Sequence, residues 1–518
     1  MATDMTLPGL LARNRATVPD RPVVISEVGT ITHAELDERS SEMAGRLAAG
    51  GVGKASRVGL MAPNGIDWVL TAAAVMRVGA VLIPLSTLLK PPELQAQLSV
   101  AAVTHLVVAR EFRGRVYLDE VESIAPGALN AGPEGRRSQV LPLLRHVWAL
   151  DAIPEDTVSR ALVSAMEADV RPADDLVVLF TSGSRGTPKG VIHTHGGGLR
   201  ATASGLASRR IGSDERLYIP MPFFWTGGFS SGLMSVLVAG ATLLTEAVPE
   251  PDRTLAMLER ERATLFRGWP DQAARLASHP GFAAADLSSL RPGSLAAVLP
   301  AEQRPRPGAR ANLFGMTETF GPYCGDRLDL DLPPDKFGSC GKPFEGFEAG
   351  IFDPETGEKC APGVNGEICV RGPNVMRGMC GRTREDVFRP DGFYPTGDLG
   401  SLDADGYLWY GGRRDDMFKV KGATVFPAEV EAALRAIDEV RLAFVTDVRD
   451  HAGTAQVAAF VVTTATLEKV ADAARARLSA FKVPTLWLIG EANDVPMTAT
   501  AKVDKAALQE LLRDKGRS

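Results

Sequence analysis

The stretch Thr181-Ser-Gly-Ser-Arg-Gly-Thr-Pro-Lys-Gly190 decides how the rest of this chain is interpreted. It follows residues 176–180, a short apolar run that predicts a buried strand. Glycines let backbone N–H groups approach a ligand closely, hydroxyls donate, and Arg185 and Lys189 bring positive charge. The loop therefore suits an anion, but it is not a Walker A loop, because Pro188-Lys189-Gly190 replaces the final Gly-Lys-[Ser/Thr]. Alone it could equally be an ordinary glycine-rich surface loop.

Length and composition set the frame for that choice. The chain has 518 residues, more than one core usually organises, so two or more domains are expected. Its net charge of −6 gives no sign of a nucleic-acid binder. The apolar stretches are too short to span a membrane, and the first residues lack the pattern of a secretory signal. We therefore expect a cytoplasmic enzyme.

The cysteines give no sign of a metal centre. There are five, at Cys324, Cys340, Cys360, Cys369 and Cys380, and none forms a CxxC pair. Paired ligand spacing is the usual mark of a zinc site, so reduced thiols are the expected state.

The pattern along the chain predicts an α/β fold. Strand and helix patterns alternate over residues 20–110 and again after residue 176, as in a parallel sheet with helices on its faces. Residues 111–142 break this rhythm and are expected to be a surface excursion. Residues 338–410 predict a small β-barrel-like unit. Two glycines and four charges at 411–416 indicate a solvated, flexible boundary. We predict a large N-terminal domain over residues 1–413 and a small, mobile α+β domain over residues 414–518.

Two helix starts have clear local signals. Thr32 is expected to cap a helix that runs toward Leu47, and Pro427 to open a helix over residues 428–437.

Two further segments carry groups suited to a nucleotide. In Asn312-Leu-Phe-Gly-Met-Thr-Glu-Thr319, Thr317 beside Glu318 could serve a phosphate oxygen and a hard cation together, although such a pair is also common at a helix start. In Tyr394-Pro-Thr-Gly-Asp-Leu-Gly400, Asp398 could accept hydrogen bonds from a ribose diol, or it could simply form an Asx turn.

Two more segments contribute single cations. Arg413 stands at the predicted domain boundary, and Lys502 lies in a Pro- and Thr-rich loop before the last predicted helix. Taken alone, Lys502 would be an exposed lysine.

In this order, the five segments resemble the adenylate-forming superfamily, which includes acyl-CoA synthetases, adenylation domains of peptide synthetases and firefly luciferase. The resemblance covers essentially the whole chain. It extends to Gly79-Ala-Val-Leu-Ile-Pro84, Gly338-Ser-Cys-Gly-Lys-Pro343 and Gly366-Glu-Ile-Cys-Val-Arg-Gly372.

The resemblance implies a role for each matching residue. ATP or AMP would be bound by Thr181, Ser182, Gly183, Ser184, Arg185, Gly186, Lys189, Phe314, Gly315, Thr317, Asp398 and Arg413. The catalytic residues would be Lys502, Thr317 and Glu318, with Glu318 as the Mg²⁺ ligand. Trp225, Gly228 and Phe229 would form the acyl pocket, Asp415 the hinge, and Lys421 and Gly422 a loop on the coenzyme A side.

Several positions depart from the family pattern. Arg185 stands where a small hydroxyl residue is usual, Trp225 where His is common, Phe314 where Tyr is common and Ala501 where Gly is usual. The glycine-rich segment that normally precedes the Phe314 motif is degenerate here, as Ser294-Leu-Ala-Ala-Val-Leu-Pro300. These departures put the acyl specificity and the rate in doubt rather than the chemistry.

The resemblance implies an ATP-dependent acyl-CoA synthetase that uses Mg²⁺ and coenzyme A. Residues 222–237 contain no charge, so an amino acid, whose ammonium group needs an acidic partner, is not the expected substrate. We expect a hydrophobic carboxylic acid that is aliphatic, aromatic or bulky and alicyclic. Three alternatives stay open: a ligase that loads a carrier protein, a luciferase-type monooxygenase and a catalytically silent nucleotide-binding protein. Monomer and homodimer are both compatible with the sequence.

Overall fold

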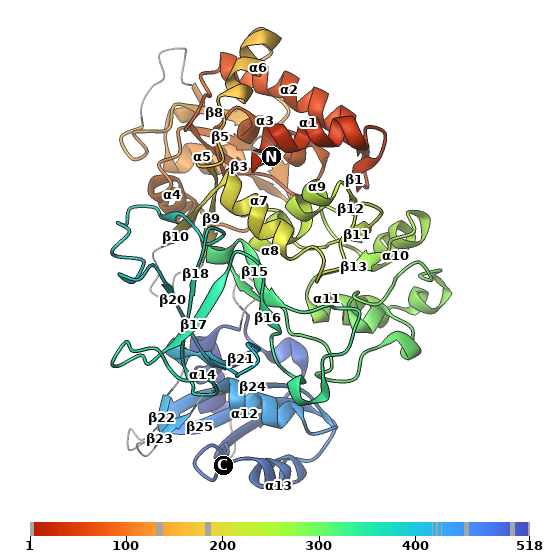
Figure 1. The fold of residues 1–518 in the computed structure, drawn as a ribbon, viewed down its shortest axis with the longest axis vertical. Helices are drawn as coiled ribbons and strands as arrows, with labels where there is room; N and C mark the ends of the chain where they lie inside the picture. Colours follow the sequence, from red (N-terminus) through yellow and green to blue (C-terminus); the bar gives the residue numbers. More distant parts are fainter. Residues whose placement is uncertain are drawn as a thin grey trace. The chain divides into compact units, whose positions relative to one another are not determined.

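The computed structural model describes residues 5–130, 138–181, 188–416, 418–420, 423–425, 427–449, 455–497 and 503–515. The chain divides into two compact units, one made of Met1–Glu348 and Arg371–Phe393, the other of Ala349–Val370 and Tyr394–Ser518 (Figure 1). The domain boundary predicted after residue 413 is instead the point about which the small domain is expected to turn, and it stays a prediction.

The first unit contains a seven-stranded sheet, mostly parallel. Its strand order is β19 (Gly378–Met379), β10 (Lys189–Thr194), β9 (Asp175–Thr181), β4 (Val81–Pro84), β3 (Arg57–Met61), β5 (His105–Val108) and β8 (His146–Ala149). Strands β9, β4, β3, β5 and β8 run parallel, whereas β10 and β19 pair antiparallel at one edge. The predicted parallel sheet is therefore confirmed, with an antiparallel hairpin added at the glycine-rich loop.

A second sheet lies beside it in the same unit. Its order is β13 (Leu265–Phe266), β11 (Arg216–Tyr218), β12 (Thr242–Leu244), β1 (Pro22–Ser26) and β2 (Gly29–Thr32). A small antiparallel sheet follows, made of β14 (Phe314–Met316), β15 (Gly321–Gly325) and β16 (Lys342–Pro343). A short hairpin joins β6 (Glu111–Phe112) to β7 (Arg115–Val116).

Helices cover these sheets (Figure 1). They are α1 (Leu7–Thr17), α2 (His33–Ala49), α3 (Ile66–Arg77), α4 (Pro91–Val100), α5 (Tyr117–Ile124), α6 (Arg160–Ala168), α7 (His195–Ser204), α8 (Thr226–Gly228), α9 (Ser235–Ala239), α10 (Pro251–Arg260) and α11 (Pro270–Ala277). A π-helix, η3 (Phe229–Met234), connects α8 to α9. Thr32 begins α2 with a capping box that pairs it with Glu35, as the sequence predicts for Thr32.

Helix α3 holds the two large sheets together. Of its residues only Asp67 is exposed, and the helix contacts β3 and β4 of one sheet and β1 and β2 of the other. A helix that is apolar all round belongs in a core, which agrees with its Ala- and Val-rich sequence.

The second unit combines a four-stranded sheet with a small α+β body. The sheet order is β17 (Glu348–Phe352), β18 (Gly366–Arg371), β20 (Tyr394–Leu402) and β21 (Leu408–Arg413). The remaining elements are β22 (Phe418–Val420), β23 (Ala423–Val425), α12 (Pro427–Arg435), β24 (Val440–Arg449), β25 (Ala455–Thr463), α13 (Leu467–Arg477), β26 (Leu486–Ile489) and α14 (Lys505–Lys515). Pro427 opens α12, as predicted from its suitability for the first helical turn.

Two predictions about local structure are wrong. Residues 111–142 are not a plain surface excursion, because α5 buries Tyr117, Val121 and Ile124 in the core of the larger sheet. Gly411 and Gly412 are not a flexible linker, because they belong to β21, where Gly412 pairs with Leu399.

Among the described residues, no helix is both long and apolar enough to cross a lipid bilayer.

Candidate active site

The ends of the glycine-rich loop are fixed by a β-hairpin. Strands β9 and β10 pair antiparallel, with Thr181 opposite Lys189 and Phe180 opposite Gly190. Gly190 has no room for a side chain, because an added Cβ would lie 2.9 Å from a Val178 methyl group and 3.0 Å from the Cys380 sulfur. Residues Ser182, Gly183, Ser184, Arg185 and Gly186 lie outside the described residues. The hairpin thus presents its loop from two rigidly paired strands.

The segment with Thr317 and Glu318 forms a sharp turn between β14 and β15. A 3₁₀ turn, η7 (Thr317–Thr319), follows β14, and Phe320 reverses the chain in the left-handed conformation with φ of 58°. Gly315 is required by close backbone packing, because an added Cβ would lie 2.3 Å from the Gly321 carbonyl oxygen. The Thr319 hydroxyl donates to that same oxygen at 2.7 Å.

Within this turn Glu318 is nearly buried, with 6% of its surface exposed, whereas Phe314 and Thr317 are half-buried. Phe314 lies edge-on to Tyr323, with ring centroids 5.6 Å apart. The turn is therefore rigid while Phe314 and Thr317 keep surface for a ligand.

Three contacts from distant parts of the chain hold the turn in place. The His193 Nε2 atom of β10 lies 2.7 Å from the Thr317 carbonyl oxygen. The Thr226 hydroxyl of α8 lies 3.0 Å from the Thr317 hydroxyl. The Met376 backbone N–H donates to the Glu318 carbonyl oxygen at 2.8 Å. Thr317 therefore contacts both the strand that closes the glycine-rich loop and the segment predicted to form the acyl pocket.

His193 is a residue of this arrangement that the sequence analysis did not single out. It is 1% exposed, and burial lowers its pKa to about 4, so the ring is neutral at pH 7. Since a carbonyl can only accept, Nε2 carries the proton and donates it. The sequence signal that could have identified it is a histidine in the strand that directly follows the glycine-rich loop.

The predicted acyl segment has an irregular helical structure. Trp225 is half-buried and precedes α8, and its ring stands edge-on to Phe224 at 5.6 Å. The π-helix η3 follows, and such helices often mark functional sites. Gly228 admits no side chain, since an added Cβ would lie 2.1 Å from the Pro222 carbonyl oxygen. Phe229 is fully buried against Trp68 and Phe320, so it anchors the segment to the core.

The second unit brings Asp398 and Arg413 together by strand pairing. The two residues are opposite each other in β20 and β21, and Arg413 Nη1 donates to Asp398 Oδ1 at 3.1 Å. Arg413 also donates to the Thr396 carbonyl at 3.0 Å, and the Asp398 N–H donates to the Thr396 hydroxyl at 3.0 Å. The pair predicted from two separate motifs is thus one local structure.

Other predicted residues cannot be placed. Asp415 is the middle residue of a 3₁₀ turn, η9 (Arg414–Asp416), but its side chain is not among the described ones. Lys421, Gly422 and Lys502 lie outside the described residues.

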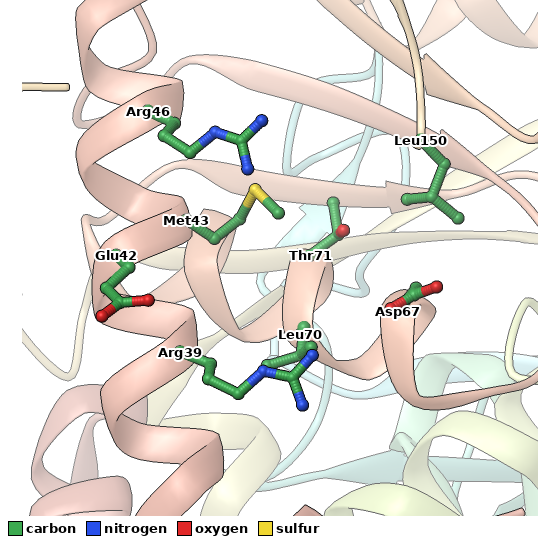
Figure 2. Close-up of a pocket in the computed structure, with 8 residues that line it drawn as sticks. All are labelled: Arg39, Glu42, Met43, Arg46, Asp67, Leu70, Thr71 and Leu150. Carbon is green, nitrogen blue, oxygen red and sulfur yellow. The ribbon is translucent and has the colours of Figure 1, made fainter. Parts of the chain in front are cut away.

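A pocket of about 200 Å³ lies elsewhere in the first unit, between α2 and α3 (Figure 2). It is lined by Arg39, Glu42, Met43 and Arg46 of α2, by Asp67, Leu70 and Thr71 of α3, and by Leu150. None of the residues discussed above lines it.

Comparisons with known proteins identify the family of this chain. The family model described as AMP-binding enzyme matches residues 11–380. A Mycobacterium tuberculosis 3-[(3aS,4S,7aS)-7a-methyl-1,5-dioxo-octahydro-1H-inden-4-yl]propanoyl:CoA ligase is 33% identical, over 98% of this chain and 99% of its own length. A feruloyl-CoA synthase from an Amycolatopsis species is 30% identical, over 96% of this chain and 97% of its own.

A solved structure of a coenzyme A synthetase has a similar fold over nearly the whole chain. The O-succinylbenzoate coenzyme A synthetase of Bacillus subtilis, crystallised with ATP and magnesium, matches with a TM-score of 0.77 and 25% identity, covering 96% of this chain and 99% of that one. The chain belongs to the AMP-binding enzyme family of adenylate-forming proteins. Within that family it is an AMP-forming acyl-CoA synthetase, an acid–thiol ligase that uses ATP and coenzyme A.

Proposed function

We propose that this enzyme activates a hydrophobic carboxylic acid in two half-reactions. In the first, a carboxylate oxygen of the acid attacks the α-phosphorus of ATP, and the bond from that phosphorus to the leaving pyrophosphate breaks. In the second, the coenzyme A sulfur attacks the acyl carbon of the adenylate, the acyl–oxygen bond breaks, AMP leaves and the thiol proton is released. The observation that supports this proposal is that Thr317, in the turn before Glu318, contacts both His193 of β10 and Thr226 of α8.

The first half-reaction joins two anions, so its main requirement is neutralisation and alignment of charge. A carboxylate is already ionised at pH 7, so no general base is needed. The glycine-rich loop with Lys189 would hold the β- and γ-phosphates, and the Thr317 hydroxyl would bind a phosphate oxygen. Lys502 would donate to the acid and to the α-phosphate as negative charge develops there. Phe314 would lie against the adenine, and Asp398 with Arg413 would bind the ribose.

The residues present fit a magnesium ion that is shared with ATP. Among the described residues, no three or more His, Cys, Asp or Glu side chains gather into a group that could hold a metal ion. Mg²⁺ is commonly held by one or two carboxylates together with substrate phosphates, which suits the nearly buried carboxylate of Glu318. When bound, the ion would offset charge on the phosphate oxygens.

For the second half-reaction we propose a domain rotation about Asp415. The rotation would withdraw Lys502 and bring Lys421 and Gly422 toward the thiol, in the manner of hinge-driven enzymes.

The acid is proposed to be bulky and largely apolar. No charged residue occurs in 222–237, and the segment contributes the half-buried Trp225 ring. The relative with 33% identity acts on a propanoic acid that carries a fused bicyclic dione, and the relative with 30% identity acts on an aromatic acid. We therefore place alicyclic and aromatic acids first, and medium or long aliphatic acids next.

Acid-dependent exchange of pyrophosphate into ATP tests this proposal. A panel should compare bulky alicyclic, aromatic and aliphatic acids with short polar acids and amino acids, using wild type and Lys502→Ala. Hydrophobic acids are expected to stimulate exchange, and the variant is expected to lose about 100- to 1,000-fold of it. Added coenzyme A should then yield the thioester. Turnover of short polar acids or amino acids alone would overturn the proposed substrate class.

A further inference from the structure

His193 connects the strand that closes the glycine-rich loop to the turn that carries Glu318. It belongs to β10, four residues after Lys189, and its ring points out of the sheet toward η7. Its Nε2 atom lies 2.7 Å from the Thr317 carbonyl oxygen, which also accepts the Phe320 N–H at 3.0 Å. That oxygen therefore receives one bond from inside its own turn and one from β10.

The ring of His193 also contacts the other end of the turn. It lies edge-on to Phe320, with centroids 4.9 Å apart. Phe320 holds a left-handed backbone conformation that a large side chain rarely adopts, so surrounding contacts must stabilise it. Phe229 of η3 also packs edge-on against Phe320, with ring centroids 5.9 Å apart. His193 thus touches the residues on both sides of Glu318 and Thr319, namely Thr317 before them and Phe320 after them.

A second histidine provides an internal comparison. His195 is two residues further along and fully buried, and burial lowers its pKa to about 4 as well. Its Nδ1 accepts the Leu7 N–H of α1 at 3.1 Å. The two residues match in type and burial and are two positions apart, but of the two only His193 is bonded to η7.

We propose that His193 is a positioning residue for adenylation, which acts by fixing the Thr317 carbonyl to strand β10 and so holding the Thr317 hydroxyl and the Glu318 carboxylate in place. This inference rests on the proposed function. A residue that orients a ligand-binding group typically affects activity about 10- to 100-fold when it is removed.

Paired substitutions separate positioning from simple packing. His193→Phe keeps a ring against Phe320 and removes the donor, whereas His193→Gln keeps an N–H at about the position of Nε2 and removes the ring. His195→Phe is the matched control. Thermal unfolding, binding of MgATP by calorimetry and acid-dependent exchange should be measured for all three and for wild type.

The expected result is a fall in the kcat of exchange for His193→Phe of about 10- to 100-fold, with weaker MgATP binding and a smaller change in the KM for the acid. His193→Gln should recover most of that loss. His195→Phe should lose similar thermal stability and keep exchange within about threefold, because the His195 ring is bonded to Leu7 and not to η7.

Equal activity of folded His193→Phe and His195→Phe would overturn the positioning role while leaving the proposed function intact. Failure of wild type to bind MgATP or to support exchange with any acid would overturn both.

Discussion

The hydroxyl groups of Thr226 and Thr317 lie 3.0 Å apart, although the two residues are separated by 91 positions in the chain. Thr226 follows Trp225 in the segment proposed to receive the acid, and Thr317 precedes Glu318. Under the proposed roles of the two residues, this one hydrogen bond would link binding of the acid to placement of the phosphates.

Thr226→Val should weaken that link. It replaces the hydroxyl by a methyl group of similar size, so the Thr317 hydroxyl loses a partner and about 1 kcal/mol of stabilisation. We expect exchange to fall several-fold at saturating acid. Thr226→Ser, which keeps the hydroxyl, is the control and should stay near wild type. A normal rate in the valine variant would show that the hydrogen bond between Thr226 and Thr317 does not contribute to activity.

Glu318→Gln should raise the Mg²⁺ concentration needed for half-maximal exchange and lower kcat by about 100-fold or more, because the nearly buried carboxylate is replaced by a neutral amide. A titration of Mg²⁺ at fixed ATP measures both effects. Glu246→Gln is a suitable control, because Glu246 is 2% exposed and accepts from the Tyr218 hydroxyl at 2.8 Å, on other elements. That control should change stability and leave the Mg²⁺ dependence as it is.

Arg413→Lys should weaken ATP binding with little effect on the acid. Lysine is not expected to reproduce both the bond to Asp398 and the bond to the Thr396 carbonyl, so the carboxylate would lose its fixed orientation. The KM for ATP should rise about tenfold, which corresponds to the loss of one hydrogen bond to a charged group. Discrimination between ATP and 2′-deoxy-ATP should also decrease. Arg414→Lys is matched to it, because Arg414 pairs with Glu367 at the same 3.1 Å, and it should leave the KM for ATP unchanged.

Trp225→Ala should change which acids are accepted more than it changes the maximal rate. Removal of a half-buried indole frees space beside Phe224, so larger acids should gain relative to smaller ones. The ratio of kcat/KM between a large and a small acid measures this. Trp269→Ala removes an indole that is 54% exposed and should leave that ratio unchanged. An unchanged ratio in Trp225→Ala would show that the Trp225 ring does not line the acyl pocket.

Stability should fall as the pH drops below 6.5. Burial lowers the pKa of His33, His105, His193 and His195 from 6.5 to about 4. Between these values the unfolded chain binds more protons than the folded one, so the free energy of unfolding decreases as the pH falls from 6.5 to about 4. Above pH 6.5 the neutral histidines cause no such loss. Each histidine contributes up to about 3 kcal/mol to this loss. The unfolding temperature measured across this window should depend less steeply on pH in His195→Phe than in wild type.

The sequence predicted individual elements well where a local signal was strong. Thr32 begins α2, Pro427 begins α12, and the apolar run before the glycine-rich loop is β9. It failed for α5, whose buried Tyr117, Val121 and Ile124 are hidden among Gly, Pro and Arg residues that suggest a loop. It also failed for Gly411 and Gly412. Both belong to β21, which pairs with β20, and this pairing overrides the flexibility of glycine.

The candidate site was predicted residue by residue but not as an arrangement. Asp398 and Arg413 are close because their strands are paired, and the register of that pairing is a tertiary property. The bond between His193 and Thr317 spans 124 positions, so no local pattern announces it. What local chemistry can indicate is the type of group needed, while the fold decides which groups meet.

The burial of α3 between two sheets has an evolutionary consequence. A helix whose circumference is enclosed almost completely offers hardly any position where a polar or larger side chain would be tolerated. Residues 66–77 should therefore diverge slowly among descendants of this gene, whereas the half-buried positions of the 222–237 segment, such as Trp225, have more room to change with the acid proposed to bind there. New substrate preferences could then arise without disturbing the part of the protein that determines whether it folds.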